Sequence, residues 1–156
     1  MKYRSILLFG APGSGKGTQG RVLAELPGIF YFASGDAFRA LKDDDPLAKK
    51  FRDYSNRGEL VPDDLTVELC CQHIKSREEG GGFQPENDLL LLDGIPRNPE
   101  QVNMMAETIN VRAILHLVCP DIEPIIERII KRAVIEGRQD DASEDVVRNR
   151  FATYKR

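Results

Sequence analysis

The stretch Gly10–Thr18, with the sequence Gly-Ala-Pro-Gly-Ser-Gly-Lys-Gly-Thr, has the residue types of a phosphate-binding turn. The apolar run Ile6–Phe9 before it predicts a buried strand, and residues 19–25 after it predict the start of a helix. Glycines let backbone N–H groups turn inward, and a helix N-terminus adds partial positive charge. Lys16 adds a full charge that reaches the outer phosphates of a nucleotide. The stretch therefore predicts a phosphate cradle.

The residues after the lysine depart from the general P-loop pattern, which places Ser or Thr there as a magnesium ligand. Here Gly17 follows the lysine and Thr18 comes one position later. The segment GAPGSGKGTQ closely resembles the first motif of the adenylate kinase family of nucleoside monophosphate kinases, which itself has Gly and then Thr at these positions. A glycine-rich turn with a chance lysine is the alternative, and the strand–turn–helix context argues against it. The ATP-binding residues that the resemblance implies here are Gly13, Ser14, Gly15, Lys16, Gly17 and Thr18.

Two further segments are similar to the part of that family that binds the acceptor nucleotide. Residues 33–39, ASGDAFR, resemble the family's S-T-G-D-x-x-R stretch. The resemblance implies that Arg39 binds the acceptor phosphate and that Ser34 stands where a threonine contacts adenine. An arginine suits this role because its planar fork meets a phosphate at two oxygens. Taken alone, an arginine here would be more typical of a solvated helix. The turn GELVP resembles a G-x-x-V-P motif whose backbone, here at Leu60 and Val61, lines the acceptor; a plain turn between helices would contain the same Gly and Pro.

The segment 93–97, Asp-Gly-Ile-Pro-Arg, looks like the family's D-G-x-P-R signature. Asp93 ends a predicted strand beside the P-loop strand, where a carboxylate can hold the water shell of Mg²⁺. The resemblance implies that Arg97 binds the acceptor phosphate together with Arg39, and that Gly94 lies on the same acceptor side. Two arginines on one phosphate would orient its oxygen for in-line attack.

The choice of acceptor base depends on Gln101, four residues beyond Arg97. A glutamine can bond adenine through both its donor and its acceptor atoms. Adenylate kinases carry Gln at this place, whereas their pyrimidine-specific relatives carry Asn. Asn98, directly after Arg97, resembles the P-R-N sequence of those relatives. We expect adenine, with a UMP/CMP or broad-specificity nucleoside monophosphate kinase as the alternative.

Four arginines near the C-terminal end resemble the family's lid. Arg128 and Arg132 are one helical turn apart and project from one face, Arg138 lies in the sequence GRQDD, and Arg150 precedes a Thr-Tyr pair. Charge runs of this kind are usually solvated helix surfaces. The resemblance implies that Arg128 and Arg132 bind ATP and that Arg138 and Arg150 also contact AMP. The catalytic set that it implies is Lys16, Arg97, Arg132, Arg138 and Arg150.

The reaction that these residues would perform is phosphoryl transfer from MgATP to AMP, which yields two molecules of ADP. The acceptor phosphate is already an anion, so positioning and charge neutralisation suffice without a protein base. We therefore expect structural roles for His73 and His116. A nucleotide-binding module without useful turnover is the alternative from a different functional class.

Strands alternate with helices along the chain, which predicts a parallel sheet with helices on both faces. We expect a single α/β domain over residues 1–156, of the three-layer P-loop NTPase type, with a small helical acceptor-binding segment at 34–61 and a short lid at 133–142. We expect Ser34 or Asp36 to cap one helix and Ser143 to cap the last, and Val22, Leu23 and Leu26 to face inward. The predicted strands are 5–9, 29–33, 89–92 and 113–118, and the main predicted helices are 16–25, 46–56, 63–77, 99–109 and 122–133.

Composition limits the remaining possibilities. The net charge of −3 gives no reason to expect nucleic-acid binding. The N-terminus runs straight into the first strand, and no apolar run approaches the length of a membrane span; we expect a cytoplasmic protein that does not bind membranes. Three cysteines, two of them adjacent and none in a C-x-x-C pair, predict neither disulfides nor the lid zinc site of some bacterial adenylate kinases.

Length is the main departure from the family, in which another strand and helix follow the lid helix. Without them the fourth strand becomes an apolar sheet edge that can pair with another chain. We expect the complete protein to be a monomer and this chain to be open to association through that edge. The sequence is either a fragment or a reduced variant, and we favour a fragment.

Overall fold

The computed structural model describes residues 2–138, 141 and 143–155. Its contacts divide these residues into two compact units, which are described separately. Unit 1 contains the residues up to Phe9 together with Gly15–Leu41 and Pro62–His116. Unit 2 contains Gly10–Ser14, Lys42–Val61 and the residues from Leu117 onward.

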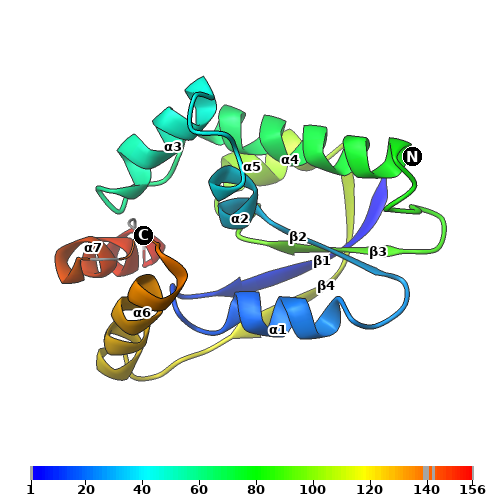
Figure 1. The fold of residues 1–156 in the computed structure, drawn as a ribbon. Coiled ribbons are helices and arrows are strands. Elements are labelled where there is room, and N and C mark those ends of the chain that lie inside the picture. The colour runs from blue at the N-terminus through cyan, green and yellow to red at the C-terminus, as the bar shows by residue number, and fades with distance from the viewer. Residues whose placement is uncertain (1, 139–140, 142, 156) are drawn as a thin grey trace. The chain divides into compact units, whose positions relative to one another are not determined.

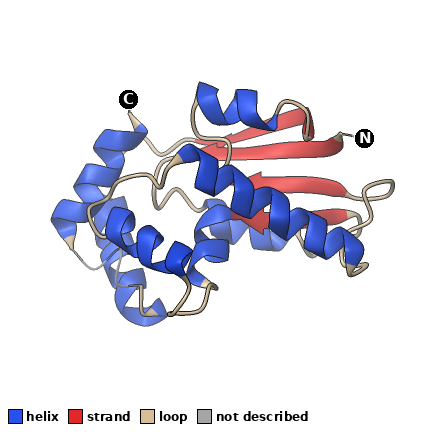
Figure 2. Cartoon of the chain, turned by 90° about the horizontal axis from the view of Figure 1, so that it is seen from above, coloured by secondary structure: helices blue, strands red, loops and turns tan. Residues whose placement is uncertain are grey.

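The sheet runs through unit 1, and within the described residues it has four parallel strands in the order β2-β3-β1-β4. The strands appear as red arrows in Figure 2. In the register, Leu8 of β1 and Ala33 of β2 both pair with Asp93 of β3. The α/β fold with a parallel sheet, of the P-loop NTPase type, is therefore confirmed. The strands are β1 (Tyr3–Gly10), β2 (Ile29–Ala33), β3 (Leu89–Asp93) and β4 (Ile109–Leu117).

Helices cover both faces of this sheet, with α1 on one face and α4 on the other (Figure 1). Leu90, Leu91 and Leu92 of β3 are at most 1% exposed, which is the burial expected for a strand covered on both faces. Cys70 and Ile74 of α4 pack into the same core as β3. The helices of unit 1 are α1 (Lys16–Leu23), α2 (Ser34–Arg39), α4 (Asp63–Glu79) and α5 (Pro99–Met105).

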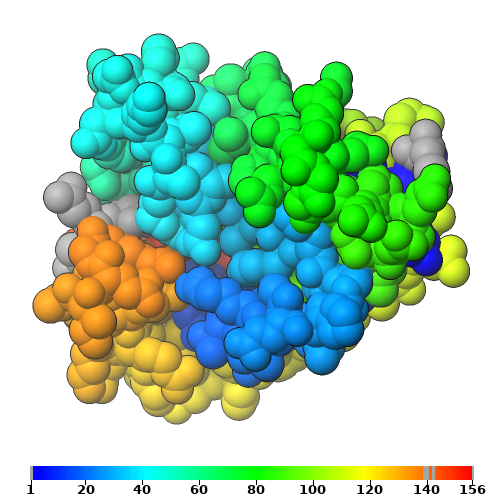
Figure 3. All heavy atoms as spheres, turned by 45° about the vertical axis from the view of Figure 1, so that its right-hand side comes forward, coloured from blue at the N-terminus to red at the C-terminus, as the bar shows by residue number. Residues whose placement is uncertain are grey.

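The inner face of α1 differs from the prediction. Val22 and Leu26, expected to point inward, are 54% and 53% exposed. Gly20 is the buried residue of this helix, because the ring of Tyr31 occupies the space beside it. Figure 3 shows the segment around α1 as blue spheres at the surface.

Two element boundaries also differ from the sequence prediction. Helix α5 ends at Met105, and β4 already begins at Ile109, which was predicted to be helical. The backbone bond from Thr108 N to Met105 O closes a turn between them. The bond from Tyr3 N to Thr108 O then aligns the incoming strand with the start of β1.

The predicted side-chain caps are absent from α2 and α7. Helix α2 already includes Ser34, whose hydroxyl donates to the Gly94 carbonyl oxygen at 3.0 Å, and no side chain caps this helix. Ser143 occupies the N-cap position of α7, but its side chain makes no capping bond. Helix α3 has the capping bond that these helices lack, because Asp45 Oδ1 accepts from Leu47 N at 2.7 Å.

Unit 2 contains α3 (Pro46–Ser55), α6 (Glu123–Glu136) and α7 (Glu144–Tyr154). Helices α6 and α7 share an apolar cluster that includes Ile129, Val147 and Phe151. Arg148 of α7 donates to Glu123 and to Glu144, each at 2.9 Å. Helix α6 runs three residues past the predicted end and stops at Gly137, whose φ of 63° is left-handed. The predicted lid thus begins inside a helix, while its residues 139, 140 and 142 lie outside the described residues.

Among the described residues, strand β4 lies at one edge of the sheet, and residues 110–116 are all exposed. Its exposed apolar side chains include Val111 (42%), Ile114 (60%) and Leu115 (40%). Cys70, Cys71 and Cys119 are all free thiols. Among the described residues, no helix combines the length and the apolar character needed to cross a membrane.

Candidate nucleotide-binding and phosphoryl-transfer site

The turn between β1 and α1 has the backbone geometry of a phosphate cradle. Gly13 and Gly15 adopt left-handed conformations, with φ of 72° and 96°. A Cβ on Gly13 would also lie 2.5 Å from Ile125 and 2.7 Å from Ile129, so only glycine fits. The Oγ of Ser14 is buried without a hydrogen-bond partner among the described residues. A buried orphan hydroxyl in a glycine turn fits a ligand that supplies hydrogen-bonding oxygens, as a phosphate does.

Asp93 stands at the end of β3 with 8% of its surface exposed. Burial raises the pKa of this carboxyl group, and the nearby Lys16 ammonium acts in the opposite direction. Tyr31 of β2 donates its hydroxyl hydrogen to Asp93 Oδ2 at 2.9 Å. The described residues contain no group of three or more metal-ligating side chains. A single carboxylate beside a phosphate cradle suits Mg²⁺, which keeps several waters and is usually held by one or two carboxylates and the substrate phosphates.

The predicted acceptor residues Ser34, Arg39, Gly94 and Arg97 lie close together in unit 1. The Oγ of Ser34, a residue only 2% exposed, donates to Gly94 O and receives a bond from Arg97 Nη2 at 3.4 Å. Gly94 has a φ of 78°, and a Cβ there would lie 2.8 Å from Ser34 Oγ. Arg39 pairs with Asp36 at 2.7 Å, and it acts electrostatically on Arg97, whose residue surface is exposed. Two guanidinium groups in electrostatic range of each other, one of them exposed, suit the binding of an anion.

Gln101 is buried to 1% exposure, and both ends of its amide are bonded within unit 1. Its Oε1 accepts from Arg97 N at 2.8 Å, and its Nε2 donates to Asp63 Oδ1 at 2.6 Å. A backbone N–H can only donate and a carboxylate can only accept, so these two partners fix the orientation of the amide. One N–H and one lone pair of the amide are not used by these two bonds.

Sequence reasoning missed the contacts of Asp63 and the capping role of Asn98. Asn98 Oδ1 accepts from Gln101 N at 2.8 Å as the cap of α5, and its Nδ2 donates to both oxygens of Asp63 at 3.0 Å. The Asn-Pro pair at the start of a predicted helix was the available signal, since Asn is a preferred cap and Pro a preferred first residue. Asn98 is thus occupied by the local structure rather than presented to an acceptor base.

The turn that contains Leu60 and Val61 belongs to unit 2, where it packs against α7. Leu60 is 37% exposed and Val61 is 7% exposed. A Cβ on Gly58 would lie 2.7 Å from the carbonyl oxygen of Val146, and the φ of Gly58 is 68°. Asn149 of α7 donates to the carbonyl oxygen of Arg57. The glycine of this motif is therefore required by close approach as well as by backbone conformation.

Two of the predicted lid arginines meet at a residue that the sequence analysis did not select. Asp141, with 0% exposure, accepts from Arg132 Nη2 at 2.8 Å and from Arg150 Nη1. The Nε of Arg132 is buried without a partner among the described residues. Arg138 forms an ion pair with Glu136, and Arg128 is exposed on α6. The sequence signal for Asp141 was its place in the GRQDD segment.

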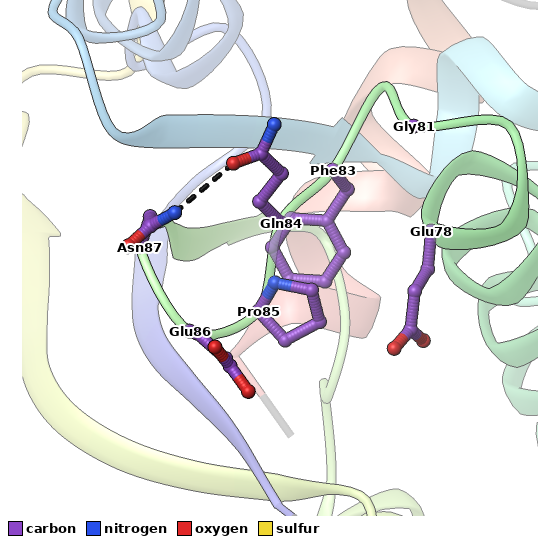
Figure 4. Close-up of a pocket in the computed structure, with 7 residues that line it drawn as sticks. All are labelled: Glu78, Gly81, Phe83, Gln84, Pro85, Glu86 and Asn87. Carbon is purple, nitrogen blue, oxygen red and sulfur yellow. Dashed lines mark hydrogen bonds between the residues drawn. The ribbon is translucent and has the colours of Figure 1, made fainter.

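A surface pocket of about 380 Å³ lies elsewhere in unit 1, between the end of α4 and the start of β3. It is lined by Glu78, Gly81 and residues 83–87, with a hydrogen bond of 3.0 Å from Asn87 Nδ2 to Gln84 Oε1 (Figure 4). It contains none of the predicted site residues. The predicted phosphate cradle and Asp93 lie at the carboxyl ends of β1 and β3, the edge at which open α/β sheets bind their ligands.

The parallel sheet, the glycine turn and the buried Asp93 beside Lys16 define a P-loop nucleotide-binding phosphotransferase. The family profile described as adenylate kinase matches residues 8–156. The chain is 40% identical to an adenylate kinase of Micrococcus luteus over 97% of this chain and 72% of that protein. Adenylate kinases of Thermobifida fusca and Kocuria rhizophila are 36% and 34% identical, each over 96% of this chain and 78% of the relative. The chain belongs to the adenylate kinase family and is a nucleoside monophosphate kinase, an ATP:AMP phosphotransferase.

Proposed function

We propose that this chain transfers the γ-phosphoryl group of MgATP to AMP, with the residues in the roles that follow. The turn from Gly13 to Thr18 holds the ATP phosphates, together with Arg128 and Arg132. Asp93 holds the water shell of Mg²⁺, which supplies charge neutralisation of the transferring group. The acceptor residues are Ser34, Arg39, Leu60, Val61, Gly94, Arg97, Gln101, Arg138 and Arg150.

The observation that carries this proposal is the juxtaposition of a buried carboxylate and a P-loop lysine. Asp93 is 8% exposed and within electrostatic range of Lys16 and Arg97. The lysine belongs to the phosphate cradle, and Arg97 contacts the Ser34 hydroxyl on the acceptor side. This arrangement supports a site in which donor and acceptor groups lie around one carboxylate that would hold the metal, as phosphoryl transfer by positioning and charge neutralisation needs.

The fixed amide of Gln101 supports adenine as the acceptor base. Its remaining Nε2–H can donate to a ring nitrogen, and its remaining Oε1 lone pair can accept from an exocyclic amino group. Because Asp63 and Arg97 N hold the amide in one orientation, it cannot flip to suit a base with the reversed order of donor and acceptor. Asn98, which favoured a pyrimidine acceptor in the sequence, is occupied by Asp63 and Gln101.

A coupled assay of ADP formation from MgATP with AMP, UMP or CMP as acceptor tests the proposal. We expect AMP to be the preferred acceptor and Lys16→Met to lower turnover by about a hundredfold or more, the scale for losing one transition-state charge contact. Lys75→Met is the matched control, because Lys75 is exposed and its nearest partner, Glu79, is 3.9 Å away. Near-normal turnover of Lys16→Met would refute the assignment, and preferred use of UMP or CMP would refute the choice of acceptor.

A further inference from the structure

The side chain of Tyr31 connects three parts of unit 1 at the edge of the phosphate cradle. Its hydroxyl donates to Asp93 Oδ2 at 2.9 Å. Its ring lies against Gly20 of α1 so closely that a Cβ there would be 2.3 Å from Tyr31 Cε2. The same hydroxyl is 3.9 Å from the point where a Cβ on Gly17 would stand. The phenol is therefore fixed between the first helix of the cradle and the carboxylate at the end of β3.

We propose that Tyr31 is a positioning residue for the magnesium shell: its hydroxyl holds the Asp93 carboxylate in one orientation and leaves the other carboxylate oxygen to the metal-bound water. This inference rests on the proposed function of Asp93. A carboxylate is free to turn about its terminal torsion unless a hydrogen bond fixes it. Partners that orient a metal-site carboxylate in this way contribute to metal affinity without touching the metal.

The chemistry of a phenol suits this task better than that of a basic side chain. A tyrosine hydroxyl donates one hydrogen bond and adds no charge. The carboxylate of Asp93 thus keeps its full negative charge for a divalent cation while one of its oxygens is satisfied. A lysine or arginine at position 31 would neutralise the carboxylate and compete with Mg²⁺ for it.

The pairing of the strands does not depend on this side-chain bond. Tyr31 pairs with Leu91 and Ala33 pairs with Asp93 in the backbone ladder between β2 and β3. Tyr31→Phe keeps the ring that packs on Gly20 and removes only the hydroxyl. The substitution therefore separates the orientation of Asp93 from the integrity of the sheet.

The test measures binding of a non-hydrolysable ATP analogue by calorimetry to the full chain, with and without Mg²⁺. For Tyr31→Phe we expect an unchanged Kd for the analogue without metal. The factor by which Mg²⁺ tightens binding of the analogue should fall about tenfold, the lower end of the effects of such partners on metal affinity. The Mg²⁺ concentration for half-maximal phosphotransfer should rise by a similar factor, with the KM for AMP unchanged. Tyr3→Phe is the matched control, since it removes a hydroxyl that donates to the carboxylate of Glu78 at 2.6 Å, outside the site.

Three outcomes would overturn the proposal. The first is an unchanged Mg²⁺ dependence in folded Tyr31→Phe, and the second is an equal loss of affinity with and without metal, which would indicate a structural role. The third is a lower Mg²⁺ dependence in the double variant Tyr31→Phe/Asp93→Asn than in Asp93→Asn alone. Tyr31 should act only through the Asp93 carboxylate, so its hydroxyl should have no effect once that carboxylate is gone. A wild-type chain without ATP:AMP transfer would instead refute the proposed function.

Discussion

Replacing Gly20 by alanine tests the packing that places Tyr31 beside the cradle. An added Cβ would lie 2.3, 2.7 and 3.0 Å from Cε2, Cζ and Cδ2 of the Tyr31 ring. The ring cannot withdraw freely, because its hydroxyl is bonded to Asp93. Gly17→Ala is the matched variant in the same helix, since a Cβ there would meet its nearest atoms at 3.7–3.9 Å, an ordinary contact distance.

Both substitutions bring the higher helix propensity of alanine, worth up to about 1 kcal/mol. The difference between them therefore isolates the cost of overpacking, which is typically about 1–3 kcal/mol. We expect the free energy of unfolding of Gly20→Ala to lie below that of Gly17→Ala by about this amount. Urea unfolding followed by circular dichroism measures both free energies, and the dependence of the free energy on urea concentration should be the same for the two variants.

Equal stability of the two variants would refute the reasoning, because it would mean that the ring of Tyr31 moves away at no cost. A second comparison checks the cause. If the ring is responsible, Gly20→Ala should cost much less in a Tyr31→Leu background, where the clashing ring atoms are gone. The coupling energy of that double-mutant cycle measures the contact directly.

Two further predictions follow from the titratable groups. Asp93→Asn should raise the melting temperature of the nucleotide-free protein while lowering phosphotransfer, because burial raises the pKa of Asp93 and an amide has no charge to desolvate. Calorimetry measures the melting temperature and the coupled assay measures phosphotransfer. A lower melting temperature would contradict this prediction. Burial, with a contribution from Arg77, lowers the pKa of His73, so the unfolded chain binds more protons and stability falls as the pH drops below about 6.5. Urea midpoints at about pH 7.5 and pH 5.5 should therefore converge in His73→Gln, and an unchanged pH dependence of the midpoint would refute this assignment.

Local sequence patterns were sufficient to predict the elements that position the site. β2 has the predicted bounds, Ile29–Ala33, and helix α1 begins at Lys16, as predicted. An apolar run after a Pro-Gly turn, and a glycine-rich turn with a lysine at a helix start, are signals contained in a few consecutive residues. The grouping of Ser34, Gly94 and Arg97 also follows, since parallel strands bring their carboxyl ends to one edge of the sheet.

Pairings between distant side chains could not be read from the same patterns. Nothing near Tyr31 in the sequence indicates that its hydroxyl meets a carboxylate 62 residues away, or that its ring lies beside Gly20, the buried residue of α1. The apolar pattern of α1 predicted large residues inside, whereas an aromatic ring from β2 fills the space and leaves room only for glycine. Ile109 suits a helix end or a strand start equally well, and a tertiary bond from Tyr3 decides between them.

For the proposed role of Arg132 and Arg150 in binding phosphate, the buried carboxylate of Asp141 has a consequence in conformational entropy. A free arginine side chain carries about 2 kcal/mol of rotamer entropy, which a flexible lid would lose at the moment when it closes on a phosphate. Arg132 and Arg150 are already held by one carboxylate with 0% exposure. Much of their freedom is thus lost on folding rather than on binding.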